Sequence, residues 1–281
     1  MRQGLSRLTV ETIDDVLAQV VDGRISRIDL RGARFVDPYA LLLLELLVLE
    51  AIERGSTPRI DWPGTPVVRR WMTAMGFFAN IGMAPKTGSS AGDRQSALQP
   101  ITAISDEEGI GRVVDGFHQR LANRYPLPEA SRRTLTAMMI ELFQNIPHHS
   151  NATGEIGNPH GIAAMQDYKE SIFLAIADKG IGLRGSLGLR LGYEKITDVQ
   201  ALDAISRKGL SRFADAGRGG ELQRIIGIVR SWDVTFALRS GAALLYFDEH
   251  RGDIYDVPDF PGVQLAIQIP LRLFDTEMVD P

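Results

Sequence analysis

The clearest hydrophobic pattern in the chain lies between residues 135 and 148. Apolar side chains recur there every three or four positions, which predicts one buried stripe of a helix: Leu135, Met138, Met139, Leu142, Phe143 and Ile146. Glu141 and Asn145 fall four residues apart on a neighbouring stripe, so a carboxylate and a carboxamide line the rim of that helix. Pro147 has no amide hydrogen, and we therefore expect the helix to kink or end there.

A second pattern is the unbroken apolar run from Ser171 to Ala177. A short run of this kind predicts a strand that is buried on both faces, in the centre of a sheet. Asp178 ends the run, and Gly180 and Gly182 follow it. Two glycines directly after a strand predict a tight turn, where a flat ligand can approach the backbone closely.

Glycines also precede a third segment, residues 223–229, which has helical character. They are Gly217, Gly219 and Gly220. Glycines that lead into a helix leave backbone amides and the positive end of the helix dipole free for an anion such as phosphate. The chain therefore carries, in this order, a helix with Glu-x-x-x-Asn, a strand followed by Asp-x-Gly-x-Gly, and Gly-x-Gly-Gly before a helix.

These three motifs in this order resemble the ATP-binding domain shared by DNA gyrase, heat-shock chaperones, histidine kinases and mismatch-repair ATPases, the GHKL superfamily. The resemblance covers about residues 100–272 and implies ATP and magnesium as ligands. By that resemblance, Asn145 would contact the magnesium ion and the phosphates, and Glu141 would be the catalytic residue that polarises the attacking water or hydroxyl. Asp178 would accept a hydrogen bond from the adenine amino group.

The same resemblance gives the glycines two roles. The first pair would shape the adenine pocket and the last three would wrap the phosphates: Gly180 and Gly182, then Gly217, Gly219 and Gly220. Residues 183–216 would form a mobile lid. In the last strand Val263 occupies the position of the usual Thr, which helps to hold a water beside the adenine, so base specificity is the weaker part of the resemblance.

The first 82 residues carry a different α/β pattern. The predicted elements are a helix over 10–21, a strand over 26–30, a helix over 39–54, a strand over 58–62 and a helix over 67–75. With Asp37-Pro38 before a leucine-rich helix and a Gly-Phe-Phe after the last helix, this order resembles the sulfate-transporter and anti-sigma-factor-antagonist (STAS) domain. Antagonists of that family carry a phosphoacceptor Ser after the Asp. Here Pro38 and Tyr39 follow Asp37, so we expect no phosphorylation.

The predicted fold is therefore α/β, with a STAS-like unit followed by a GHKL-type two-layer sandwich whose helices cover one face of a mixed sheet. We expect a STAS-like regulatory domain at 1–82, a Gly- and Ser-rich linker at 83–98 and an ATP-binding domain at 99–275. The leucine-rich helix is apolar nearly all round, which predicts burial against a sheet or a second surface.

Composition narrows the function classes. The 281 residues contain no cysteine, which excludes disulfides and thiolate metal sites. The formal net charge of −4 argues against nonspecific binding to nucleic acid or to an anionic membrane. The first residues lack the apolar core of a secretory signal, and no apolar run is long enough to cross a bilayer. We expect a cytoplasmic protein with a protein partner or a second copy of itself.

Three functions fit the motifs. The first is a signalling regulator whose ATP-binding domain acts as a protein Ser/Thr kinase, like the anti-sigma-factor kinases. The second is an ATP-dependent conformational switch that hydrolyses ATP slowly. The third is a noncatalytic, nucleotide-sensing interaction module. Phosphoryl transfer depends mostly on positioning and charge stabilisation, so one pocket can serve the kinase or the switch.

Overall fold

The computed structural model describes residues 6–21, 24–83, 99–104, 107–125, 128–150, 161–210, 221–232, 234–248, 250 and 252–274. Side chains of residues 107, 130, 131, 144–150, 221 and 274 lie outside that description. Most of the predicted linker, residues 84–98, also lies outside it.

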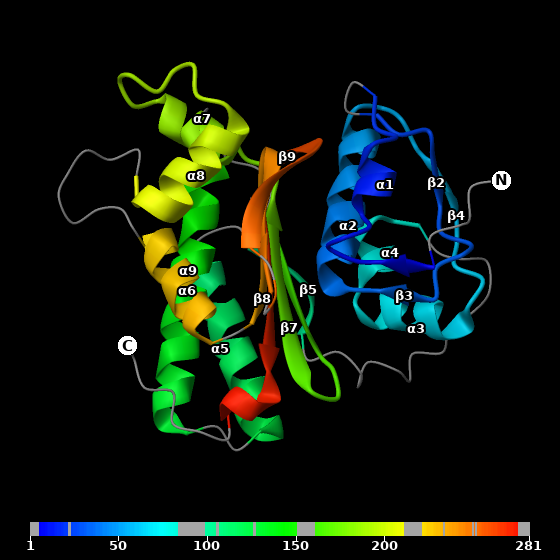
Figure 1. Cartoon of the computed structure of the whole chain (residues 1–281). Coiled ribbons are helices and arrows are strands. Elements are labelled where there is room, and N and C mark those ends of the chain that lie inside the picture. The colour runs from blue at the N-terminus through cyan, green and yellow to red at the C-terminus, as the bar shows by residue number, and fades with distance from the viewer. Residues whose placement is uncertain are drawn as a thin grey trace.

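A five-stranded sheet stands at the centre of the described residues, with the strand order β5-β6-β7-β9-β8 (Figure 1). The strands are β5 (Gln99–Ile104), β6 (Gly161–Asp167), β7 (Ser171–Asp178), β8 (Thr235–Phe247) and β9 (Gly252–Pro270). All neighbouring pairs are antiparallel, so the prediction of a mixed sheet is wrong for these strands. Between β5 and β6 the chain makes two helical passes, which return it in the direction opposite to β5.

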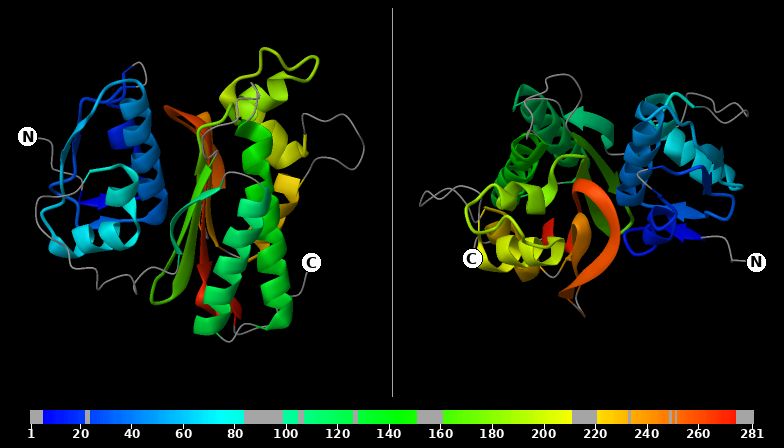
Figure 2. Two further views of the ribbon diagram at one scale, coloured as in Figure 1. Left: turned by 180° about the vertical axis from the view of Figure 1, so that it is seen from behind. Right: turned by 90° about the horizontal axis from the view of Figure 1, so that it is seen from above.

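The sheet is covered on both faces, as β7 shows residue by residue. Ile172, Leu174 and Ile176 belong to one apolar core, which includes the C-terminal helices. The alternate residues, Phe173, Ala175 and Ala177, belong to a second core, which includes the N-terminal unit. The molecule therefore has three layers: helices, sheet, and N-terminal unit (Figures 1 and 2).

The helical layer consists mainly of α5 (Glu107–Arg124), α6 (Glu129–Ser150) and α9 (Glu221–Ser231). The apolar stripe predicted for α6 is buried, and Phe143 stacks on Phe117 of α5 with ring centroids 5.9 Å apart. The helix continues past Pro147 to Ser150, so it does not end there. A proline removes one backbone hydrogen bond and crowds one carbonyl, and the remaining ladder can continue beyond it.

The predicted lid region is largely helical where it is described. It contains α7 (Gly182–Gly188) and α8 (Asp198–Lys208), and residues 211–216 lie outside the described part. Thr197 and Gln200 form a capping box at the start of α8, with each side chain bonded to the other residue's backbone amide. After β9 the chain ends its described part in a short 3-10 helix, Leu271–Phe274.

The N-terminal unit contains two pairs of short parallel strands and four helices among its described residues. The strands are β1 (Arg7–Leu8), β2 (Arg27–Asp29), β3 (Phe35–Val36) and β4 (Arg59–Asp61), paired β1-β3 and β2-β4. The helices are α1 (Asp14–Leu17), α2 (Pro38–Glu53), α3 (Pro66–Ala74) and α4 (Phe77–Asn80). The five predicted elements occur in the predicted order, although α1 is shorter than the helix expected over 10–21, and β1, β3 and α4 were not predicted.

Helix α2 begins where the sequence predicts. The Asp37 carboxylate accepts hydrogen bonds from the amide of Ala40, at 2.7 Å, and from the amide of Val10, at 3.0 Å. Pro38 occupies the first turn, where a missing amide hydrogen costs little. From Pro38 to Val48 every side chain is buried, because the helix lies between the rest of its own unit and the sheet.

A row of four alanines crosses the sheet on the face that is turned toward α2. Each alanine is paired in register with the next one across the sheet. The pairs are Ala164 of β6 with Ala175 of β7, Ala175 with Ala266 of β9, and Ala266 with Ala237 of β8. All four are buried in the same core as the leucines of α2. Methyl side chains leave room for a leucine-rich helix close to the strands, and α2 contacts β6, β7 and β9.

One apolar core therefore includes residues on both sides of the predicted domain boundary. The assignment of 1–82 and 99–275 to separate domains stays a prediction. The two units pack against each other through apolar side chains that belong to this one core. Within the described part of the chain, no helix has both the length and the apolar character needed to cross a membrane.

Candidate functional site

Asp178 ends the central strand β7 and is only 2% exposed. It follows Leu174 and Ile176 in the strand alternation, so its side chain belongs to the face that the helices cover. Its Oδ1 accepts the amide hydrogens of Gly180, at 2.6 Å, and of Val263, at 3.3 Å. Burial raises the pKa of this carboxyl to about 7, although the two amides act in the opposite direction.

The backbone around Asp178 requires glycine at two positions. Gly182 begins α7 with φ of +68°, and a Cβ there would lie 2.8 Å from Ser240 Oγ and 3.1 Å from the carbonyl oxygen of Gly262. Gly262 has φ of +86°, and its Cβ would lie 2.2 Å from the carbonyl oxygen of Asp178. The turn after β7 and the start of the last strand segment are therefore packed backbone against backbone.

Two buried polar side chains hold this turn in place. Gln264, which is fully buried, donates from Nε2 to the carbonyl oxygens of Asp178, at 3.0 Å, and Pro261, at 2.7 Å. Ser240 Oγ accepts the amide hydrogen of Leu183, at 2.8 Å, and so fixes the first turn of α7 against β8. The predicted residues Asp178, Gly180 and Gly182 thus form one ordered structure.

Glu141 lies on α6 in the helical layer and is partly buried. Its Oε1 forms an ion pair with Arg224 of α9, the helix that the predicted phosphate glycines precede. Helix α6 contacts β7, α7 and α9, which brings the Glu-x-x-x-Asn helix to the elements on either side of Asp178. Asn145 is in α6, one turn after Glu141, and its side chain lies outside the described part.

The three glycines that are predicted to wrap the phosphates, Gly217, Gly219 and Gly220, lie outside the described residues. The structure therefore describes the residues predicted to bind adenine and the helix that carries Glu141, while both ligand roles and the phosphate loop stay predictions. Among the described residues, no group of three or more His, Asp or Glu side chains lies close enough to hold a metal ion. The magnesium prediction rests on Asn145.

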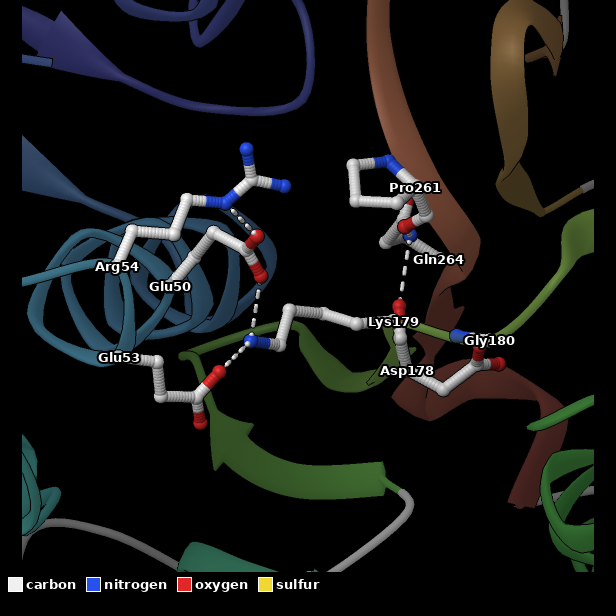
Figure 3. A network of polar contacts seen from close by, with 8 residues as sticks. All are labelled: Glu50, Glu53, Arg54, Asp178, Lys179, Gly180, Pro261 and Gln264. Carbon is white, nitrogen blue, oxygen red and sulfur yellow. Dashed lines mark hydrogen bonds and ion pairs between the residues drawn. The ribbon is translucent and has the colours of Figure 1, made fainter. Parts of the chain in front are cut away.

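On the opposite face of the sheet, directly behind Asp178, Lys179 turns toward the N-terminal unit (Figure 3). Its Nζ donates to Glu50 Oε2, at 2.7 Å, and to Glu53 Oε2, at 3.0 Å, both on α2. Arg54 donates from Nε to the other oxygen of Glu50, at 2.5 Å. Burial alone would raise the pKa of Glu50, but Lys179 and Arg54 outweigh it and lower that pKa.

A second polar contact between the two units is made by Arg239 of β8. Arg239 is fully buried, and its guanidinium donates to the hydroxyl of Tyr39, at 3.2 Å, to the carbonyl oxygen of Pro258, at 2.9 Å, and to the carboxylate of Asp14. Burial disfavours the charge of Arg239, but Tyr39 and Asp14 outweigh it and raise the pKa above its ordinary value. Tyr39 itself is fully buried, and the expectation that it accepts no phosphate stays a prediction.

Sequence reasoning missed several residues of this region, and four of them show why. Gln264 had a signal, because it is a polar residue inside the apolar run of β9. Gly262 also had one, as a glycine directly before that run. Arg224 and Arg239 had no such signal, because the side chains that they bind belong to residues more than 80 and more than 190 positions away in the chain.

No protein-family model matches this sequence, and no match was found among curated proteins or among solved structures.

Proposed function

We propose that this protein is an ATP-binding signalling regulator whose C-terminal part is a GHKL-type nucleotide-binding unit. One observation carries the proposal: Asp178 is a buried carboxyl at the end of a central strand, on the helix-covered face, in a turn built from Gly180, Gly182 and Gly262. The adenine amino group needs a buried acceptor, and Gly182 and Gly262 let the turn pack closely enough to hold this acceptor in place.

The amide of Val263 adds independent support. It donates to the same Asp178 oxygen, so the position that carries the usual Thr in the GHKL superfamily lies beside the proposed adenine acceptor. Glu141 comes from α6, on the same side of the sheet, and would orient the water or hydroxyl that attacks the terminal phosphate. Asn145 would hold the magnesium ion, which neutralises phosphate charge in such reactions.

Among the three functions, the ion pair between Glu141 and Arg224 favours the slow conformational switch as the alternative to the kinase. In this conformation Arg224 occupies one oxygen of the Glu141 carboxylate. A general base must reach its water, so turnover would require this ion pair to open. Because Glu141 and Arg224 lie on different helices, nucleotide-dependent movement of α9 against α6 would couple that opening to the ligand.

The proposal is tested by calorimetry with magnesium and ATP. We expect the wild-type protein to bind ATP, and the Asn145→Ala variant to lose most of that affinity, because the metal and the phosphates lose a ligand. GTP should bind more weakly than ATP, since its carbonyl would face the Asp178 acceptor, at a cost of about 1–3 kcal/mol. Unchanged ATP affinity in Asn145→Ala would contradict the proposed site.

The reaction is resolved by incubating the protein with labelled ATP. Label on the protein or on an added partner indicates a kinase, and slow release of free phosphate indicates the switch. Binding without either product indicates the noncatalytic sensing module.

A further inference from the structure

Two side chains, Lys179 directly after β7 and Arg239 in β8, contact the N-terminal unit. Each is the neighbour in sequence of a residue that shapes the candidate nucleotide site. Lys179 follows Asp178, and Arg239 precedes Ser240. Lys179 binds Glu50 and Glu53 on α2. Arg239 binds Asp14 of α1 and Tyr39 of α2.

Adjacent residues of a strand point to opposite faces of the sheet. Asp178 and Ser240 act on the face where the helices lie, Asp178 as proposed adenine acceptor and Ser240 as acceptor for the first turn of α7. Lys179 and Arg239 act on the other face. A movement of α1 or α2 that displaces either cation therefore displaces the peptide next to a residue of the site.

The contact at Lys179 is the one more directly connected to Asp178. The Lys179 amide bond lies inside the turn that Asp178 Oδ1 closes through the Gly180 amide, at 2.6 Å. Lys179 and Glu50 are each only about one-fifth exposed, at 21% and 20%, so water screens this pair less than it screens a surface pair. Helix α2, which carries both carboxylates, packs on the alanine row of the sheet.

We propose, on the basis of the nucleotide-binding function above, that Lys179, Glu50 and Glu53 are positioning residues through which the N-terminal unit sets nucleotide affinity. The contact holds the Asp178–Gly180 turn in the conformation that receives adenine. A partner that shifts α2 would loosen this turn and weaken nucleotide binding. By reciprocity, nucleotide binding would tighten the contact between α2 and the sheet.

The test uses the full chain and measures the Kd for magnesium ATP in four variants: Lys179→Met, Glu50→Gln, the double variant, and Glu108→Gln as control. The control removes an exposed ion pair with Arg112 on α5, outside the interface with the N-terminal unit. We expect each single variant to raise Kd by about 2-fold to 30-fold. The double variant should bind no more weakly than the weaker single variant, because the Lys179–Glu50 pair is lost in both single variants. The control should keep the wild-type Kd.

Amide hydrogen exchange separates positioning from general destabilisation. In the protein without nucleotide, Lys179→Met should speed exchange at Gly180 and Leu183 while core amides of β7 keep their protection. In the wild-type protein, ATP should slow exchange in α2. If Lys179→Met does not fold, Glu50→Gln alone, which changes a partly buried side chain in the last turn of α2, is measured for the same Kd and exchange rates.

The outcomes distinguish this inference from the proposed function. A wild-type protein that binds no nucleotide overturns both. Wild-type binding with unchanged Kd in both single variants overturns the positioning role and leaves the nucleotide site standing. Additive losses in the double variant would show that Lys179 and Glu50 act separately, and would also overturn it.

Discussion

Buried carboxyl groups are the distinctive feature of this protein at the scale of single residues. Asp37, Glu45 and Asp178 are each 2–3% exposed, and burial raises the pKa of each to about 7. Asp37 and Asp178 accept backbone amides that stabilise the charged form. Glu45 accepts a bond from Asn80 on Oε1, at 3.0 Å, and its Oε2 has no hydrogen-bond partner among the described residues. Of the three carboxyl groups, Glu45 therefore has the fewest hydrogen bonds that stabilise its charged form.

We expect Glu45→Gln to be more stable than the wild type at pH 8 and equally stable near pH 4.5. The folded protein holds a proton on Glu45 up to about pH 7, whereas the unfolded chain releases it near 4.5. The free energy of unfolding of the wild type therefore falls by on the order of 3 kcal/mol as the pH rises from 4.5 through 7. Urea unfolding of both proteins across this range measures the difference. Asp37 and Asp178 titrate in both proteins, so a constant difference would contradict the role of Glu45.

Gly262 gives a second prediction at this scale. Gly262→Ala should cost more free energy of unfolding than Gly55→Ala, although both residues have positive φ, +86° and +75°. Each alanine meets the left-handed backbone penalty of about 1–2 kcal/mol. Only at Gly262 does the new Cβ also meet backbone, since nothing lies within 4 Å at Gly55. Equal losses in denaturant unfolding would mean that the Asp178 turn can move aside.

At the scale of elements, the two faces of β7 differ in size of side chain. The face toward the C-terminal helices carries Ile172, Leu174 and Ile176. The face toward α2 carries Phe173, Ala175 and Ala177. The large residues pack against the helices of the C-terminal layer. Small residues let the leucine-rich α2 pack close, so one strand satisfies two different layers.

Ala175→Leu should therefore destabilise the protein by about 1–3 kcal/mol, because the added atoms have no space between β7 and α2. Ala122→Leu is the matched control, since Ala122 is exposed on α5 and should change stability by less than about 0.5 kcal/mol. Thermal and urea unfolding give both values. A gain in stability for Ala175→Leu would show that α2 does not pack closely on the alanine row.

At the scale of the whole molecule, the N-terminal unit is a structural layer of the protein. Deletion of residues 1–90 would expose the alanine row together with Phe173, Phe260 and Tyr246. It would also leave Arg239, which is fully buried in the intact chain, without Asp14 and Tyr39. Full burial of one large apolar side chain is worth about 1.5–3 kcal/mol, which is a large part of the stability of most domains.

We expect the 91–281 fragment to aggregate or to unfold cooperatively at a much lower temperature than the intact chain. Co-expression with the 1–90 fragment should restore a folded complex, because the shared core can form between two chains. Size-exclusion chromatography and circular dichroism measure both outcomes. A monodisperse, folded 91–281 fragment would show that the sheet needs no second layer and that the domain boundary drawn from the sequence is also a folding boundary.

Local patterns in the sequence predicted some of the elements and the turn that contains Asp178, Gly180 and Gly182, whose role toward adenine stays a prediction. Asp37 and Pro38 predict where α2 begins, the stripe from Leu135 to Ile146 predicts α6, and the run ending at Asp178 predicts the central strand, because each depends on neighbours within a few residues. Only the tertiary structure decided that the strands are antiparallel and that α2 covers the second face of the sheet. It also decided that Lys179 and Arg239 join the two units. The contacts of Lys179 and Arg239 with the N-terminal unit connect residues more than 120 positions apart. Complementarity of shape and charge between such distant residues leaves no local pattern in the sequence.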